Sequence, residues 1–333
     1  MTSSQPLERS RRLPLRTKLA FSAGSVEEAI VGAASMATML FYNQVLGLSA
    51  GLCGVVFLIA SIVDGVSDPL IGAFSDRFKS RWGRRHPLML FAAMPLAIAF
   101  YCLYQPPDGL TETGLFTWFL GFMVLMRTAK TFYTVPHAAL GAELTEDYHE
   151  RTSIFGYNSV VGMIAGIGFG LFILLVVFPS TPEFSNGLLN ESRYSLLAAF
   201  GAVIIVVSLF LCTFGTRDQI PYLHQPPPRE IHFREYFGEL WQLLCNRSYI
   251  AVCASWFVLS ISIGILIVVS TYTYIYAFEL STEQLTIQRF VSLPGILIVL
   301  PLSVYLTKLL DKKRTLIYAC LVTAFFMGLP FCL

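Results

Sequence analysis

The sequence predicts an all-α integral membrane protein, and three observations support this fold class. Hydrophobic residues make up 55% of the 333 residues and charged residues only 13%, whereas a soluble protein carries roughly 25% charged residues. Apolar stretches of about 20 residues recur along the chain, and this is the length that an α-helix needs to cross a bilayer. The stretches are continuous and not alternating, so a membrane β-barrel is not expected.

Each predicted helix is one such apolar stretch, bounded by polar loops. In chain order, we expect nine membrane-spanning helices at about 19–46, 52–75, 88–105, 115–142, 154–178, 194–214, 248–278, 286–308 and 315–333. The sixth and seventh are separated by a long polar segment that contains three consecutive prolines and then an amphipathic stretch. We expect this stretch to form a helix along the membrane surface.

This pattern predicts four parts of the chain. They are a cytoplasmic tail at 1–18, a six-helix bundle at 19–214, a cytoplasmic linker at 215–247 and a second bundle at 248–333. Two bundles joined by a linker are typical of secondary transporters, in which the substrate binds near the middle of the membrane between the halves. The second bundle has only three predicted helices, so we expect the chain to be truncated or to be completed by another polypeptide.

The cations predict the orientation in the membrane. Nineteen of the 23 Lys and Arg residues lie in the N-terminal tail, the linker and the loops on the same side as these two. The loops on the other side hold only Arg193 and Arg289. By the positive-inside rule, the N-terminus, the loop at 76–87 and the linker are expected to face the cytoplasm.

Two acids inside the second span are the first candidates for a binding site. Asp64 and Asp68 are four residues apart, so they share one face of a helix. Acids within a membrane helix are costly and usually functional, and this pair can bind Na⁺ or share a proton. The alternatives are structural: Asp68 precedes Pro69 and can cap a helix break, and Asp76 can simply pair with loop arginines.

Further charged residues lie within the first and fourth spans. Glu27 and Glu28 are adjacent and point in different directions, so we expect one of them to face a cavity and contact substrate. Arg127 and Lys130 share a helix face, and they either contact substrate or pair structurally with the acids of the first two spans. Thr131 and Thr134 continue this face, and the polar Asn158 of the fifth span is a further candidate for substrate binding. His137 either relays a proton or is a packing residue.

Other chemistry finds little support in the chain. The seven cysteines are scattered, and no pair has the spacing of metal ligands. No Walker loop, dinucleotide fingerprint, HExxH motif or nucleophile elbow is present. We therefore expect neither an enzyme nor a cofactor, but a coupling ion, Na⁺ or H⁺. The expected partners are a small-molecule substrate and the lipid bilayer, and not a nucleic acid.

Two motifs resemble a known family. The first runs from Asp64 through Asp68-Pro69 and Asp76-Arg77 to Arg81-Trp82-Gly83-Arg84-Arg85-x-Pro87. The second is Val135-Pro136-His137-Ala138-Ala139-Leu140, followed by Glu143-Leu144-Thr145-x-Asp147-Tyr148-x-Glu150-Arg151-Thr152. Together they resemble the glycoside–pentoside–hexuronide:cation symporters, the melibiose-permease-like branch of the major facilitator superfamily. The resemblance covers about the first 175 residues well, and the remainder by helix pattern only.

The resemblance implies a twelve-helix, two-bundle fold, of which about nine helices are present, and cation-coupled sugar uptake by alternating access. It implies a cation site at Asp64, Asp68 and Thr131, and sugar contact by Glu28. The chain departs from the family pattern elsewhere: the family's fourth-helix aspartate falls at Thr134, and its fifth-helix arginine falls near Ser159. Cation coupling therefore transfers better than the identity of the sugar.

We accordingly expect a sugar or glycoside symporter in the cytoplasmic membrane. The expected cytoplasmic gate consists of Asp76, Arg77, Arg81, Arg84 and Arg85, whose arginines can pair with acids such as Glu143. Two alternatives stay open: a carrier of lipids or other non-sugar solutes from the same family, and a membrane subunit or sensor that transports nothing.

Overall fold

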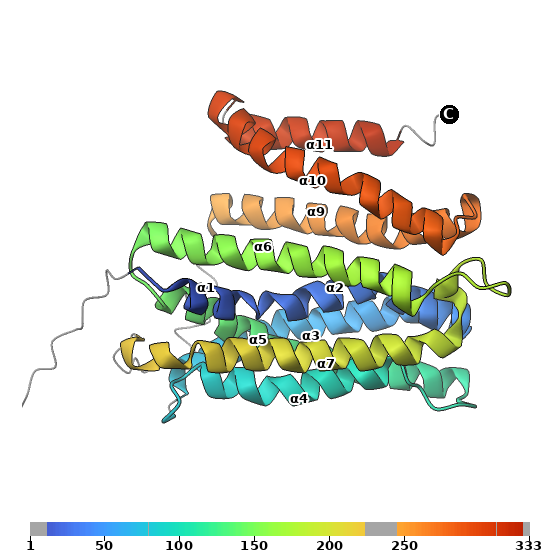
Figure 1. Ribbon diagram of the computed structural model, residues 1–333, viewed down its shortest axis with the longest axis horizontal. Coiled ribbons are helices and arrows are strands. Elements are labelled where there is room, and N and C mark those ends of the chain that lie inside the picture. Colours follow the sequence, from blue (N-terminus) through green and yellow to red (C-terminus); the bar gives the residue numbers. More distant parts are fainter. Residues whose placement is uncertain (1–11, 79, 224–244, 311, 329–333) are drawn as a thin grey trace, which may run out of the picture. The chain divides into compact units, whose positions relative to one another are not determined.

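The computed structural model (Figure 1) describes residues 12–78, 80–223, 245–310 and 312–328. Within these ranges every regular element is a helix, so the expectation of an all-α protein is confirmed. The chain divides into two compact units, one ending at Thr282 and the other beginning at Glu283. The expected surface helix of the linker lies outside the described residues.

The described residues of the first unit form seven long helices and one short one. They are α1 (Leu15–Ser22), α2 (Ser25–Leu40), α3 (Ala50–Arg77), α4 (His86–Leu103), α5 (Glu112–Glu143), α6 (Tyr148–Phe172), α7 (Tyr194–Gly215) and α9 (Arg247–Tyr272). Three π-helical turns extend α2, α6 and α9, namely η1 (Phe41–Val45), η2 (Ile173–Val177) and η6 (Thr273–Ala277). Three short 3₁₀ turns are η3 (Gly187–Leu189), η4 (Glu191–Arg193) and η5 (Arg217–Tyr222).

The second unit contains the body of α10 (Thr282–Leu310) and α11 (Lys312–Gly328). Both helices overlap the apolar stretches expected at 286–308 and 315–333. The last five residues of the latter stretch lie outside the described residues.

Most observed helices begin and end within a few residues of the expected spans, with one correction. The first expected span, 19–46, is divided between α1 and α2 at Ala23–Gly24. Among the described residues, five helices are long and apolar enough to cross a membrane: Ala50–Arg77, His86–Leu103, Tyr148–Val177, Glu191–Gly215 and Arg247–Ala277. Helices α2 and α5 overlap expected spans but are not among these five. Helix α2 carries Glu27 and Glu28 within its length, and α5 carries Arg127 and Lys130.

Polar side chains fix the starts of four long helices. Ser49 Oγ accepts a hydrogen bond from Leu52 N at the start of α3, and Thr111 Oγ1 accepts one from Gly114 N at the start of α5. Asp147 and Asn246 cap α6 and α9 in the same way. These side chains satisfy backbone N–H groups that have no partner within the helix.

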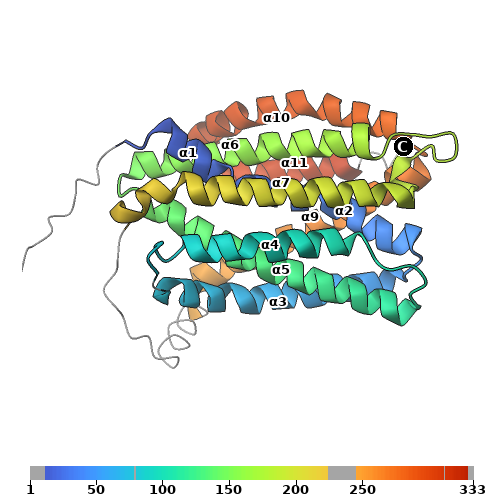
Figure 2. The same cartoon turned by 60° about the horizontal axis from the view of Figure 1, so that its bottom comes forward.

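The long helices of the first unit lie side by side (Figures 1 and 2). Helix α5 packs against α3 and α4, α4 also packs against α7, and α2 packs against α6. Stacked aromatic rings fill the core at one end. The ring centroids of Tyr42 and Phe119 are 3.8 Å apart, and those of Phe41 and Tyr194 are 4.1 Å apart. The opposite end carries the 76–87 loop and is called the basic end below.

Candidate ion and substrate site

Asp64 and Asp68 lie one turn apart on α3 and have different surroundings. Asp64 is half-buried, and its Oδ2 atom is 3.0 Å from Arg127 Nη1 on α5. Asp68 is exposed, and among the described residues it has no hydrogen bond or ion pair. Helix α3 continues unbroken through Pro69, so Asp68 does not cap a helix break. That structural alternative for Asp68 is therefore wrong.

Two hydroxyl groups lie beside this acidic pair. Thr131 is buried, and its Oγ1 atom lies 3.4 Å from Ser67 Oγ. Ser67 is on α3 between the two acids in sequence, so this turn of α3 carries two carboxylates and a hydroxyl group opposite Thr131 of α5. Oxygen ligands of this kind suit hard cations. Ser67 was not predicted, and the only signal for it was its position three residues after Asp64 on the same helix face.

The adjacent carboxylates of α2 point in different directions, as their adjacency predicts. Glu28 is 70% exposed at its side chain, and its Oε1 atom is 3.5 Å from Lys130 Nζ. Glu27 is fully buried, and among the described residues neither of its carboxylate oxygens has a hydrogen-bond partner. Glu28 is therefore the better placed of the two to contact a solute.

Thr134 and Asn158 have different hydrogen-bonding surroundings. Thr134 Oγ1 donates a hydrogen bond to the backbone oxygen of Lys130, and the backbone oxygen of Asn158 accepts one from Ser25 Oγ at 2.9 Å. Asn158 Oδ1 is buried without a hydrogen-bond partner in the described part of the chain. The structure thus groups Glu28 and Lys130 directly, while no contact connects Asn158 to them.

His137 is a packing residue in this structure. Its Nε2 atom is 2.9 Å from the carbonyl oxygen of Phe21, and its ring stacks on Phe21 at 4.2 Å. The Tyr133 ring also stacks with the His137 ring, with 5.3 Å between the two ring centroids. These contacts occupy the imidazole within the core, and they support the packing alternative for His137 over a proton relay.

Three of the five expected gate residues form one network at the basic end. Glu143 Oε1 accepts hydrogen bonds from Arg84 Nη2 and Arg85 Nη2, both at 2.8 Å. Arg85 also contacts Asp76 Oδ1 at 2.5 Å and Ser75 Oγ. The network joins α3, α4 and α5 within the first unit.

The other two expected gate residues lie outside these bonds. Arg77 is the exposed last residue of α3, and Arg81 is exposed in the following loop. The arginine–glutamate pairing predicted for Arg84 and Arg85 is therefore observed. The same pairing is not observed for Arg81 in the described structure.

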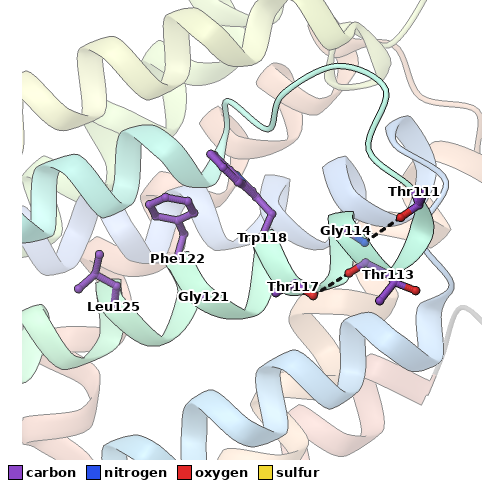
Figure 3. A pocket seen from close by; sticks show the side chains of 8 residues that line it. All are labelled: Thr111, Thr113, Gly114, Thr117, Trp118, Gly121, Phe122 and Leu125. Carbon is purple, nitrogen blue, oxygen red and sulfur yellow. Dashed lines mark hydrogen bonds between the residues drawn. The ribbon is translucent and has the colours of Figure 1, made fainter.

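A separate cavity of about 640 Å³ lies along α5 near its first turns. Figure 3 shows its lining, with Trp118, Phe122 and Leu125 beside threonines and glycines of the same helix. The Trp118 indole N–H donates to the carbonyl oxygen of Cys102 at 2.9 Å. Neither Arg127 nor Lys130 lines this cavity, so it is distinct from the acidic site.

Among the described residues, no group of three or more His, Cys, Asp or Glu side chains is arranged to hold a metal ion. The candidate site instead combines two carboxylates with hydroxyl groups and a guanidinium.

Comparisons with known proteins agree with this picture. A family model described as MFS/sugar transport protein matches residues 20–333. The inner membrane symporter YicJ of Escherichia coli is 28% identical over 254 residues, which are 74% of this chain and 53% of YicJ. The putative glycoside/cation symporter YagG of E. coli is 25% identical over 73% of this chain and 52% of its own length. An isoprimeverose transporter of Lactiplantibacillus pentosus is 25% identical over 55% of this chain and 37% of its own length. The chain spans about half the length of YicJ and YagG.

Proposed function

The chain belongs to the MFS/sugar transport protein family, and from this premise we propose that it carries out cation-coupled symport of a sugar or glycoside. The family match and the relatives named as symporters bear out the resemblance to the glycoside–pentoside–hexuronide:cation symporters. Those names describe the relatives, and the activity is extended to this chain as a proposal.

The observation that carries the proposal is the cluster of oxygen atoms between α3 and α5. Asp64, Ser67 and Asp68 lie within about one turn of α3, and Thr131 Oγ1 of α5 is 3.4 Å from Ser67 Oγ. Binding a cation there offsets the cost of holding two acids inside a membrane protein. A cation that favours the substrate-accepting state then couples its own gradient to solute uptake.

The solute is proposed to bind beside this cluster, at Glu28 and Lys130. The Glu28 carboxylate is largely exposed and its contact with Lys130 Nζ, at 3.5 Å, is long. Sugar hydroxyl groups can donate to the carboxylate and accept from the ammonium group. The same contact leaves both groups free to exchange their bond for one to a solute.

We propose the cytoplasmic membrane as the location, with the basic end in the cytoplasm. The relative YicJ is named an inner membrane symporter, and the positive-inside rule gives the orientation. The network of Arg84, Arg85, Asp76 and Glu143 would then lie at the cytoplasmic end of α3, α4 and α5.

An uptake assay tests the function. The full chain is placed in vesicles, and uptake of labelled sugars and glycosides is measured with Na⁺ or choline outside, each at two pH values. The proposal expects accumulation of at least one sugar that depends on a Na⁺ or H⁺ gradient. Equal signals in vesicles with and without the protein, for every sugar and ion, would contradict it and favour a subunit or sensor. Accumulation of a lipid analogue alone would favour a lipid carrier.

A further inference from the structure

The pair between Arg127 and Asp64 places a fixed positive charge at the proposed ion site. Arg127 Nη1 is 3.0 Å from Asp64 Oδ2, on the same carboxylate that a coupling cation would use. The two side chains are 32% and 26% exposed, so neither is fully buried by the rest of the chain. In this structure the charge of Asp64 is thus balanced by a group of the chain itself.

This pair is held by one hydrogen bond in the described structure. Arg127 Nε is buried and has no hydrogen-bond partner among the described residues. A guanidinium that grips a carboxylate with two parallel bonds is held more firmly than one that uses a single bond. The bond between Arg127 and Asp64 is therefore of a kind that a small cation can replace.

The neighbouring oxygen atoms offer a place from which such a replacement can start. Asp68 is exposed and has no ion pair in the described residues, and Ser67 and Thr131 present hydroxyl oxygens one turn or less away. A cation bound by these groups would lie next to Arg127. Because like charges repel, a cation at Asp64 weakens the pair that Arg127 forms with the same carboxylate.

We propose that Arg127 is an internal competitor of the coupling cation, here Na⁺: it occupies Asp64 in the ion-free state and must leave when Na⁺ binds. The inference rests on the proposed function, because the coupling ion is the species with which Arg127 competes. Arg127 thereby sets the affinity for the ion. When displaced, its guanidinium lies on the same helix face as Lys130, so ion binding changes the charge presented beside Glu28.

A Na⁺ titration of the full chain in lipid nanodiscs tests this directly. Thermal unfolding is followed by tryptophan fluorescence while Na⁺ replaces choline at constant ionic strength. Arg127→Gln removes the competitor and is expected to lower the half-saturating Na⁺ concentration at least tenfold. Arg127→Lys keeps a charge that can pair with Asp64, and its half-saturating concentration is expected to stay closer to that of the natural protein. An unchanged or higher value in Arg127→Gln overturns the proposal.

Two matched variants separate direct competition from a general field effect. Lys130→Gln removes an equal charge one turn along α5, so it is expected to lower the half-saturating concentration by a smaller factor than Arg127→Gln does. Arg193→Gln removes a cation far along the chain in η4 and is expected to have no effect. Equal effects in Arg127→Gln and Lys130→Gln mean that only the net charge matters, and the proposal fails.

The outcome is distinguishable from that of the proposed function. A lower half-saturating Na⁺ concentration in Arg127→Gln supports competition even when no sugar is taken up, provided that Asp64→Asn/Arg127→Gln loses this gain. Na⁺-driven uptake with no change in Na⁺ affinity in Arg127→Gln supports transport and rejects competition. Uptake driven only by protons, with no response to Na⁺ in any variant, likewise rejects it.

Discussion

At the scale of single residues, the two acids of α3 have different structural duties. Asp64 is paired with Arg127, so its removal leaves a guanidinium without its partner inside the protein. Asp68 has no bond in the described structure to lose. Replacing the aspartate by asparagine is therefore expected to lower stability at position 64 but not at position 68, although the two residues lie one turn apart.

Asp68→Asn is expected to lose ion-stimulated uptake and to keep its stability. Replacing the carboxylate removes a charged ligand, so uptake stimulated by the ion should fall at least about tenfold, the effect of about 1.4 kcal/mol. The free energy of unfolding should change by less than about 0.5 kcal/mol, as for an exposed position without partners. Vesicle uptake and thermal unfolding measure the two quantities. Undiminished ion stimulation in Asp68→Asn would remove Asp68 from the site.

At the scale of elements, a glycine lies at the break between α1 and α2. A Cβ atom at Gly24 would collide with Tyr133 Oη and His137 Nε2, which approach the backbone there. Glycine leaves the space for these buried side chains of α5. The break is thus a packing feature of the contact between the first helices and α5.

Gly24→Ala is expected to destabilise the protein by about 1–3 kcal/mol, the usual cost of forcing extra atoms into a packed core. Gly32→Ala on the same helix is the matched control, because nothing lies within 4 Å of its added Cβ. Alanine there is expected to be neutral or to stabilise α2 by up to about 1 kcal/mol. Thermal unfolding of both variants decides the matter: equal melting temperatures would show that the core yields at Gly24.

The network at the basic end ties three helices through one carboxylate. Glu143→Gln removes the charge that faces Arg84 and Arg85, and the Arg85 side chain is only 5% exposed. The free energy of unfolding is expected to fall by about 1–3 kcal/mol. This is less than the cost of about 3–5 kcal/mol for a buried charge without any partner, because Asp76 still pairs with Arg85. Arg81→Gln is the control, and its unfolding should shift by less than about 0.5 kcal/mol. A larger shift in Arg81→Gln than in Glu143→Gln would contradict the network described here.

The helices could be predicted from the sequence because each is a long apolar run, and length alone locates such a run. The close packing at Gly24 could not, because it involves side chains of α5 more than 100 positions away along the chain. The pairing of Arg127 with an acid was among the expected alternatives, since a buried cation needs a partner. Ser67 was missed because a single serine within an apolar helix carries no distinctive pattern.

At the scale of the whole first unit, α9 contacts the other helices at the end opposite the basic end. Tyr272 Oη donates to Asn43 Oδ1 at 2.8 Å, and Tyr276 Oη donates to Gln44 Oε1 at 2.5 Å. At its other end, residues 247–258 of α9 are all exposed. If the proposed transport alternately opens the two ends, we propose that these tyrosine bonds hold this end closed.

The loop between α6 and α7 adds to this closure. Asn186 Nδ2 donates to the carbonyl oxygen of Leu280 at 3.1 Å, and Gly187 N donates to Thr282 Oγ1 at 2.9 Å. Both bonds reach the segment that follows η6. The closed end is therefore held by backbone and side-chain hydrogen bonds from two separate parts of the first unit.

The native thiol of Cys53 reports on this end, since it is fully buried in the first turn of α3. Removing both hydroxyl groups in Tyr272→Phe/Tyr276→Phe keeps the rings and deletes two hydrogen bonds, each worth about 0.5–1.5 kcal/mol. The ratio of open to closed molecules should then rise roughly 5- to 150-fold, the factor that about one to three kcal/mol produces. An impermeant maleimide should alkylate Cys53 faster by the same factor, in a background where the other six cysteines are replaced.

Tyr249→Phe, at the exposed start of α9, is the control and should leave the alkylation rate of Cys53 unchanged. If the double variant reacts no faster than this control, the tyrosine bonds do not hold the end closed, and the closure must depend on the bonds of Asn186 and Gly187.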